Sequence, residues 1–151
     1  MASSMPLRHE LKFFISEMQY IVLSGVLDQV LHRDPNGDEL NEYHIRSLYF
    51  DDPWDSAVQE KADGIEVRDK FRIRIYNGDA SHMNLEIKEK LHGYTKKTGC
   101  PLTREQADRI LAGLPPRIEA GTPAPLNLLA MEMQLNRLRP VVIVDYERTA
   151  Y

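Results

Sequence analysis

The most regular pattern in the chain is the alternation of apolar and polar side chains along residues 70–76. Successive side chains of a β-strand point to opposite faces, so this stretch predicts a strand with one apolar and one charged face. The charged face carries Lys70, Arg72, Arg74 and Tyr76. Residues 85–90 repeat the arrangement, and the Asn77-Gly78 pair before them is a turn signal. We therefore expect these two strands to pair as a hairpin.

The hairpin concentrates positive charge on one side of the sheet. Pairing is expected to bring Arg72, Arg74 and Lys88 side by side, where like charges repel and lower stability. Two interpretations are open. The charged face is in water, as is common for antiparallel sheets and as spacing alone favours, or it binds a polyanion.

Four further elements are expected before the hairpin. Residues 7–15 alternate like a strand, and a capping box at Ser16 opens an amphipathic helix to about Leu31. We expect the broad apolar face of that helix to serve as scaffold. A strand is expected over residues 43–51, followed by a short helix or loop to Asp63, with Trp54 at the edge of the core.

After the hairpin, residues 91–102 are expected to form a hairpin-like segment with a glycine at each bend. Helices are expected over residues 103–113 and 126–138, separated by a proline-rich irregular stretch. Residues 141–151 predict a strong final strand. Its apolar run, residues 141–144, is expected to be buried.

Composition narrows the class of protein. The 151 residues are one domain's worth of chain, and the net charge of −4 places the cationic strands in an acidic protein. This argues against non-specific binding of nucleic acid and favours a local anion site. Cys100 is the only cysteine, which excludes an internal disulfide, and we expect it to be structural. With no signal peptide and no apolar stretch long enough to span a bilayer, we expect a cytoplasmic protein without membrane insertion.

Several kinds of catalytic site are poor candidates. The sequence has no Gly-rich phosphate loop, and its five histidines are scattered, which disfavours nucleophilic and zinc chemistry. The remaining hypothesis is a curled sheet whose Arg and Lys side chains face a cavity and bind a linear polyphosphate. Glu10 lies between Arg8 and Lys12, either as an ion-pair partner or as part of a site for a metal-bound phosphate, and spacing does not separate the two.

An ordered series of motifs carries a family resemblance. The motifs are Arg8-x-Glu10-x-Lys12-Phe13, Ser47-Leu-Tyr-Phe-Asp51, Lys70-x-Arg72-x-Arg74-x-Tyr76, Leu85-Glu-x-Lys88, Lys96-Lys97 and Pro140 with Val144-Asp-Tyr-Glu-Arg148. In this order they resemble the polyphosphate polymerase domain of the vacuolar transporter chaperone (VTC) family, which belongs to the triphosphate tunnel metalloenzymes related to the CYTH superfamily. The resemblance implies an α+β fold, an antiparallel β-barrel of the triphosphate tunnel type with peripheral helices, formed by residues 1–151 as a single domain.

The resemblance also implies an activity. A phosphotransferase of this kind uses ATP to extend inorganic polyphosphate, with Mn²⁺ or Mg²⁺ joining once phosphate is bound. Arg72, Arg74 and Lys88 match the catalytic positions. Substrate-binding positions are matched by Arg8, Lys12, Lys61, Lys70, Lys97 and Arg148. Glu10 and Glu86 are the metal candidates, with ion pairing to neighbouring cations as the alternative.

The chain departs from the family pattern at its end. Family domains continue past the Tyr146-Glu147-Arg148 strand with strands that supply a metal-binding glutamate and further lysines. We therefore expect an incomplete, open barrel with little or no polymerase activity. Two alternative functions are a non-catalytic module that binds polyphosphate or inositol phosphates, and a tunnel-type inorganic triphosphatase. Open strand edges are templates for pairing, so a homodimer is also expected.

Overall fold

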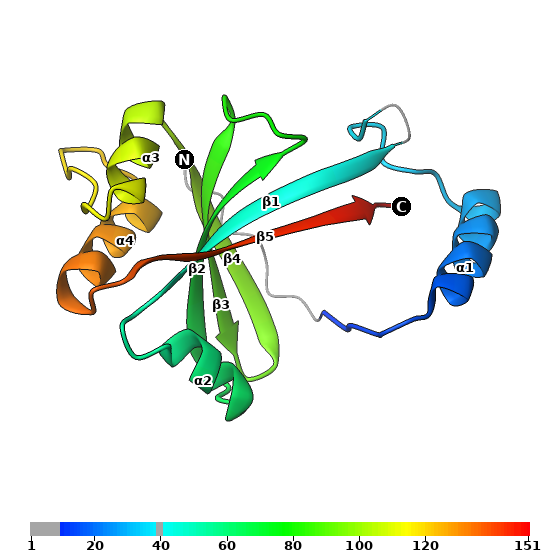
Figure 1. Ribbon diagram of the computed structural model, residues 1–151, viewed down its shortest axis with the longest axis horizontal. Coiled ribbons are helices and arrows are strands. Elements are labelled where there is room, and N and C mark those ends of the chain that lie inside the picture. Colours follow the sequence, from blue (N-terminus) through cyan, green and yellow to red (C-terminus); the bar gives the residue numbers. More distant parts are fainter. Residues whose placement is uncertain (1–9, 39–40) are drawn as a thin grey trace.

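The computed structural model describes residues 10–38 and 41–151, and its centre is one antiparallel sheet of five strands. The strands are β1 (Glu42–Asp51), β2 (Arg68–Tyr76), β3 (Met83–Leu91), β4 (Tyr94–Leu102) and β5 (Arg139–Thr149). Their order across the sheet is β4-β3-β2-β1-β5, so the last strand in the sequence lies beside the first. The sheet is twisted and does not close on itself (Figure 1). The expected α+β fold with an open, incomplete antiparallel barrel is confirmed.

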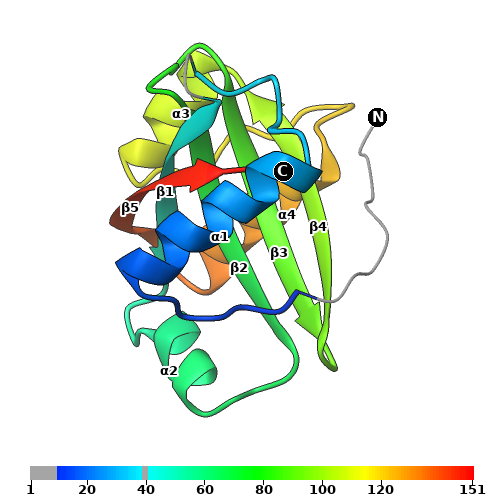
Figure 2. The ribbon, with the colours of Figure 1, turned by 90° about the vertical axis from the view of Figure 1, so that its right-hand side faces the viewer.

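Four helices lie around the sheet in the described part of the chain. They are α1 (Glu17–Val30), α2 (Ser56–Ala62), α3 (Arg104–Leu111) and α4 (Ala124–Leu135). Helices α3 and α4 cover one face of the sheet, while α1 lies on the other side (Figures 1 and 2). Capping boxes at Ser16 and Thr103 start α1 and α3, as the sequence predicts. None of these helices is both long and apolar enough to cross a membrane.

The core lies between α3, α4 and the apolar face of β2, β3 and β4. Its fully buried side chains include Leu85, Ile87, Ile110, Leu126 and Leu129. Full burial of each such side chain is worth about 1.5–3 kcal/mol, so this layer fixes which face of the hairpin remains polar. Cys100 is a buried free thiol in the same layer, and burial raises its pKa. These features support the structural role expected for Cys100.

The register of the central hairpin differs from the expected arrangement of cations. Arg72 lies opposite Glu86, Arg74 opposite Asn84, and Lys70 opposite Lys88. The prediction of Arg72, Arg74 and Lys88 side by side is therefore wrong, because register depends on the length of the turn and not on alternation alone. An opposite charge, not a like charge, lies across from Arg72.

The expected first strand does not form in the described part of the chain. Residues 10–15 belong to no helix or strand, and Leu11, Phe13 and Phe14 are exposed. A strand is stable only when its backbone groups find partners in a neighbouring strand, and alternation cannot show whether a neighbour exists. Residues 7–9 of the prediction lie outside the described residues.

Two expectations about burial are also wrong. Trp54 is 64% exposed, because it follows β1 in a turn in which the carboxylate of Asp52 accepts hydrogen bonds from the backbone N–H groups of Trp54 and Ser56. Helix α1 has no buried residue and stands away from the sheet (Figure 1). Its apolar face is therefore not the packed scaffold that the pattern predicts.

The final strand forms where it is expected but is not buried. Residues 141–144 are 40–59% exposed, and in the described part of the sheet β5 has a neighbouring strand on one side only. An uninterrupted apolar run is typical of a strand covered on both faces, which explains the error. In the segment 91–102, Gly99 lies within β4 and not at a bend.

Candidate anion-binding site

Two arginines on β2 form the centre of the polar face of the sheet. Arg72 is 8% exposed and Arg74 is 4% exposed. Arg72 donates from Nε and Nη2 to Oε2 of Glu86, at 2.8 and 2.5 Å, and from Nη1 to the hydroxyl of Tyr49 at 3.1 Å. Burial by itself lowers the pKa of Arg72, but Glu86 and Tyr49 more than offset it, and the net shift is upward. Arg72 is therefore held charged in a partly desolvated place.

Arg74 shares the same carboxylate. Its Nη1 lies 3.8 Å from Oε2 of Glu86, while its Nε donates to Ser47 Oγ at 3.1 Å and its Nη2 to the hydroxyl of Tyr146 at 3.2 Å. The two guanidinium groups thus converge on one anionic oxygen. That oxygen marks a point at which the protein already stabilises negative charge.

Hydroxyl groups on the neighbouring strands orient these arginines. Ser47 lies opposite Arg74, and Tyr49 lies opposite Arg72, in the register of β1 with β2. A hydroxyl accepts a hydrogen bond without cancelling the positive charge, so it fixes a guanidinium that can still attract an anion. Sequence reasoning did not identify Ser47, Tyr49 or Tyr146 as site residues. The sequence does contain a signal for these residues: Ser47 and Tyr49 alternate with apolar residues along 47–51, and Tyr146 belongs to the Val144–Arg148 motif.

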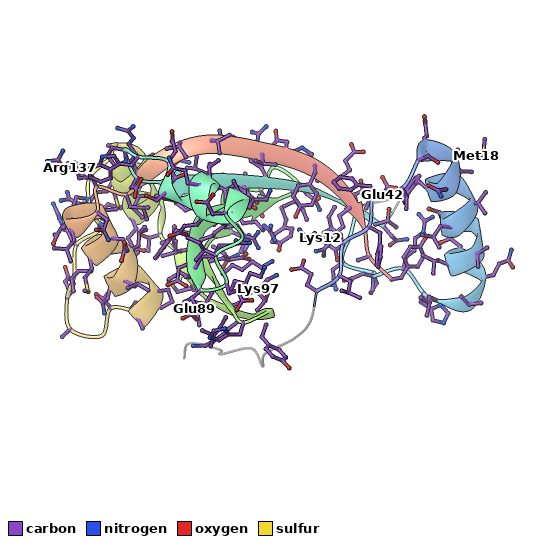
Figure 3. All side chains as sticks on the ribbon, turned by 90° about the horizontal axis from the view of Figure 1, so that it is seen from below. Lys12, Met18, Glu42, Glu89, Lys97 and Arg137 are labelled. Atoms are coloured by element: carbon purple, nitrogen blue, oxygen red, sulfur yellow. The ribbon has the colours of Figure 1, made fainter. Side chains whose placement is uncertain are left out.

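A second group of charges lies where the N-terminal segment crosses the polar face (Figure 2). Lys88 Nζ donates to Oε2 of Glu10 at 2.5 Å. The pKa of Glu10 is lowered, chiefly by this hydrogen bond and further by the charges of Lys12 and Lys97. Figure 3 shows Lys12 and Lys97 on the same side of the sheet. The structure therefore brings three of the predicted cations together around the carboxylate of Glu10, itself a predicted site residue.

The remaining predicted cations lie toward the two ends of the face. Lys70 Nζ donates to the carbonyl of Ala57 at 3.2 Å, and its pKa is lowered first by burial and then by the charges of Arg68 and Lys61. Lys61 thus lies near Lys70, at the end next to α2. Arg148 lies at the other end, with its guanidinium 5.2 Å from the ring centre of Tyr43.

Arg8, the last of the predicted cations, lies outside the described residues.

Two hollows border the sheet, and their charge differs. One, of about 230 Å³, is lined by Glu86, Lys97 and Gly99, among other residues of β3 and β4. The other, of about 370 Å³, lies beside α2 and α4 and is lined by five carboxylates: Asp51, Asp52, Glu60, Asp69 and Glu132. The pKa of Asp69 is raised there by burial and by neighbouring carboxylates. Phosphate is repelled from the larger hollow, and neither hollow is lined by Arg72 or Arg74.

The described residues contain no group of three or more His, Cys, Asp or Glu side chains that could hold a metal ion. Both metal candidates are engaged in ion pairs, Glu86 with Arg72 and Glu10 with Lys88. These contacts match the alternative interpretation, in which the two glutamates form ion pairs with neighbouring cations.

Comparison with known proteins gives a family and a fold. The family model described as VTC domain matches residues 7–151. A crystal structure of a putative adenylate cyclase from Bacillus halodurans is similar with a TM-score of 0.55 and 13% sequence identity, over 99% of this chain and 72% of that chain. At this identity the likeness concerns the fold alone. A search of curated proteins finds no match.

Proposed function

Because this chain belongs to the VTC domain family, we propose that it binds triphosphate and polyphosphate on the polar face of the sheet and acts as a divalent-cation-dependent phosphotransferase. The proposed reaction uses ATP to extend inorganic polyphosphate. One observation carries the proposal: two nearly buried arginines converge on a single anionic oxygen of Glu86. A phosphate oxygen in that position would receive charge-assisted hydrogen bonds that can be bidentate.

Phosphoryl transfer needs position and charge stabilisation from the protein more than it needs covalent chemistry. In the proposed reaction, a terminal oxygen of polyphosphate attacks the γ-phosphorus of ATP, the bond from that phosphorus to the β,γ-bridging oxygen breaks, and ADP leaves. Arg72 and Arg74 would neutralise non-bridging oxygens, with Glu86 displaced from them. Lys88, Lys97 and Lys12 would hold the flanking phosphates. The attacking oxygen is already anionic, so no general base is required.

The carboxylates fit a metal only in part. Mg²⁺ and Mn²⁺ prefer oxygen ligands, and Mg²⁺ is usually held by one or two carboxylates together with substrate phosphates. Glu10 would supply such a carboxylate, since its side chain is partly exposed and lies among the phosphate-binding lysines. When bound, the ion would offset the negative charge of the phosphates. We expect it to bind weakly without phosphate, because the described residues form no carboxylate cage.

The open sheet favours a second candidate function. In the described part of the chain, β4 and β5 are unpaired edges, so the polar face is not enclosed as in a closed tunnel. Water reaches an open face, which would allow hydrolysis of triphosphate or binding of polyphosphate or inositol phosphates without turnover. Incubation with ATP and Mn²⁺ distinguishes these outcomes by its product: long-chain polyphosphate, free phosphate, or neither.

Binding itself is tested by calorimetry with tripolyphosphate. Each charge-assisted contact is worth about 1.5–3 kcal/mol, so Arg72→Ala with Arg74→Ala should weaken binding at least a hundredfold. Arg46→Ala is the matched control, because Arg46 lies on the opposite face of β1 in an exposed ion pair with Asp145. Unchanged affinity in the double variant, with its fold retained, would refute the proposal.

A further inference from the structure

Asp51, the last residue of β1, is a buried carboxylate close to the cations of the polar face. The residue is only 3% exposed. Its Oδ1 accepts hydrogen bonds from the backbone N–H groups of Asp52 and Ala57, both at 2.9 Å. Burial of a carboxylate costs free energy unless hydrogen bonds or nearby charges compensate for the lost water. These two bonds therefore fix the place of Asp51 and tie it to the first turn of α2.

Lys70 lies in a row of lysines that crosses three strands. It is opposite Lys88 of β3, which is in turn opposite Lys97 of β4. Like charges in directly opposed positions repel each other, so the ammonium of Lys70 needs an acceptor that holds it in the row. The carbonyl of Ala57 is that acceptor, at 3.2 Å. Ala57 thus binds Asp51 through its N–H and Lys70 through its carbonyl.

Helix α2 depends on the carboxylates before it for its place against the sheet. Its N-cap residue, Asp55, has a positive φ of 56° and makes no side-chain cap hydrogen bond. The first N–H groups of the helix are bound instead by Asp52, which accepts from Ser56, and by Asp51, which accepts from Ala57. A helix of seven residues is too short to be stable alone. Loss of the bond to Asp51 should therefore let the carbonyl of Ala57 move.

We propose that Asp51 is a positioning residue of the phosphate site, which acts through Ala57 to hold Lys70 in the lysine row. A lysine side chain loses conformational freedom when it binds a ligand, and a hydrogen bond that already orients it reduces this loss. The ammonium has three donors, so it can keep its bond to Ala57 while it donates to a phosphate oxygen. This role rests on the proposed function, because it concerns phosphate binding on the polar face.

The charge of Asp51 acts in the same direction as its hydrogen bonds. Burial is the largest cause that lowers the pKa of Lys70, and the positive charges of Arg68 and Lys61 lower it further. The negative charge of Asp51 opposes these effects, and Tyr49 opposes them to a smaller extent. The carboxylate therefore favours the ammonium form of Lys70, which is the form that attracts phosphate.

A double-mutant cycle on the whole chain, with tripolyphosphate as the ligand, tests this role. Asp51→Ala and Lys70→Ala should each weaken binding about tenfold, which corresponds to the loss of one charge-assisted contact. Because Asp51 acts through Lys70, the double variant should bind no more weakly than Lys70→Ala alone. A merely structural role would lower the affinity by the same factor with or without Lys70. Additive losses would therefore overturn the proposal.

Asp52→Ala is the matched control, because Asp52 caps the same helix through Ser56. It should lower the Tm but leave the affinity for tripolyphosphate nearly unchanged. A loss of affinity equal to that of Asp51→Ala would show that any loosening of α2 has this effect, and would overturn the specific role of Asp51.

Asp51→Asn separates the charge from the hydrogen bonds and serves as the test if the alanine variant does not fold. Its amide oxygen can accept both backbone hydrogen bonds, but the negative charge is gone. We expect this variant to keep most of its affinity for tripolyphosphate at pH 7, whereas NMR titration should give Lys70 a lower pKa than in the unmodified chain. An unchanged pKa of Lys70, or an affinity as low as that of Lys70→Ala, would overturn the proposal.

Failure of this role and failure of the proposed function give different results. If the unmodified chain does not bind tripolyphosphate, the polar face is not a phosphate site and both are refuted. If it binds, and the losses from Asp51→Ala and Lys70→Ala add, only the role of Asp51 is refuted.

Discussion

Replacing Glu86 by Gln separates the two roles of this residue, as the partner that stabilises Arg72 and as the occupant of the anion position. The substitution keeps the shape of the side chain and one hydrogen-bond acceptor but removes the charge. Arg72 makes two hydrogen bonds to Glu86, both to the same oxygen. Net contributions are about 1.5–3 kcal/mol for a hydrogen bond to a charged group and about 0.5–1.5 for a neutral one. The substitution should therefore reduce the stabilisation from these two hydrogen bonds by about 2 kcal/mol in total.

The same free-energy difference should lower the stability of the folded chain and raise its affinity for tripolyphosphate. Thermal unfolding should show a Tm lower by about 4–8 °C, since 1 kcal/mol corresponds to about 2–4 °C for a chain of this size. Tripolyphosphate should bind more tightly to Glu86→Gln in the presence of EDTA, because the anion no longer displaces a carboxylate. Recovery of about 2 kcal/mol corresponds to an affinity about 30-fold higher.

A matched control is Glu10→Gln, whose ion pair with Lys88 is more exposed and should contribute no more than about 1 kcal/mol to stability. If Glu86→Gln lowers the Tm but leaves the affinity for tripolyphosphate unchanged, the anion does not bind at the arginine pair. Repeating the titration with Mn²⁺ tests whether Glu86 also binds the metal. If it does, Glu86→Gln should bind tripolyphosphate more weakly with Mn²⁺, although it binds more tightly with EDTA.

Three further predictions concern parts of the fold outside the arginine pair. In thermal unfolding, Gly99→Ala should destabilise the chain by about 1–3 kcal/mol, because its Cβ would meet a backbone carbonyl oxygen of β3 at 2.8 Å. Gly25→Ala in α1 is the contrast, since its Cβ would meet open space and the helix should gain about 0.5–1 kcal/mol. NMR titration should give Asp79 a pKa of about 2, chiefly because Ser81 donates a hydrogen bond to its carboxylate, so that its contribution to stability is present above the ordinary pKa of 3.8 and is lost as pH falls through about 2. Lys70, whose pKa is lowered by burial, should regain a higher pKa when tripolyphosphate binds, and calorimetry in buffers of different ionisation enthalpy should then detect proton uptake near the depressed pKa.

Alternation predicted the central hairpin and the face on which its cations lie, because strand geometry decides both from neighbouring residues alone. It could not predict that Glu86, and not Lys88, lies opposite Arg72, since that depends on a register set by the turn. The expected ion pairing of Glu10 needed only a nearby lysine, but the strand expected around it needed a partner strand. Alternation carries no information about a partner.

The errors in burial have a similar cause. Trp54 and residues 141–144 are apolar, and apolar side chains are usually covered, but coverage depends on what lies beside the element in space. Two of the hydroxyls that orient the arginines, those of Ser47 and Tyr49, lie on β1, next to β2. The third, that of Tyr146, lies on β5, on the far side of β1. Their approach to the arginines follows from the strand order, which no local pattern specifies.

The position of β5 also has a consequence for the order of folding. Strands β2, β3 and β4 are joined by short turns, whereas β5 reaches β1 only by closing a long loop, as shown by the bond between Arg46 and Asp145, 99 residues apart. Contacts that close long loops form late, because the loss of chain entropy precedes any gain from the contact. Hydrogen exchange should therefore find β5 among the last segments to become protected during refolding. Since Arg74 donates to Tyr146 on that strand, the arginine pair would acquire its final orientation only in this last step.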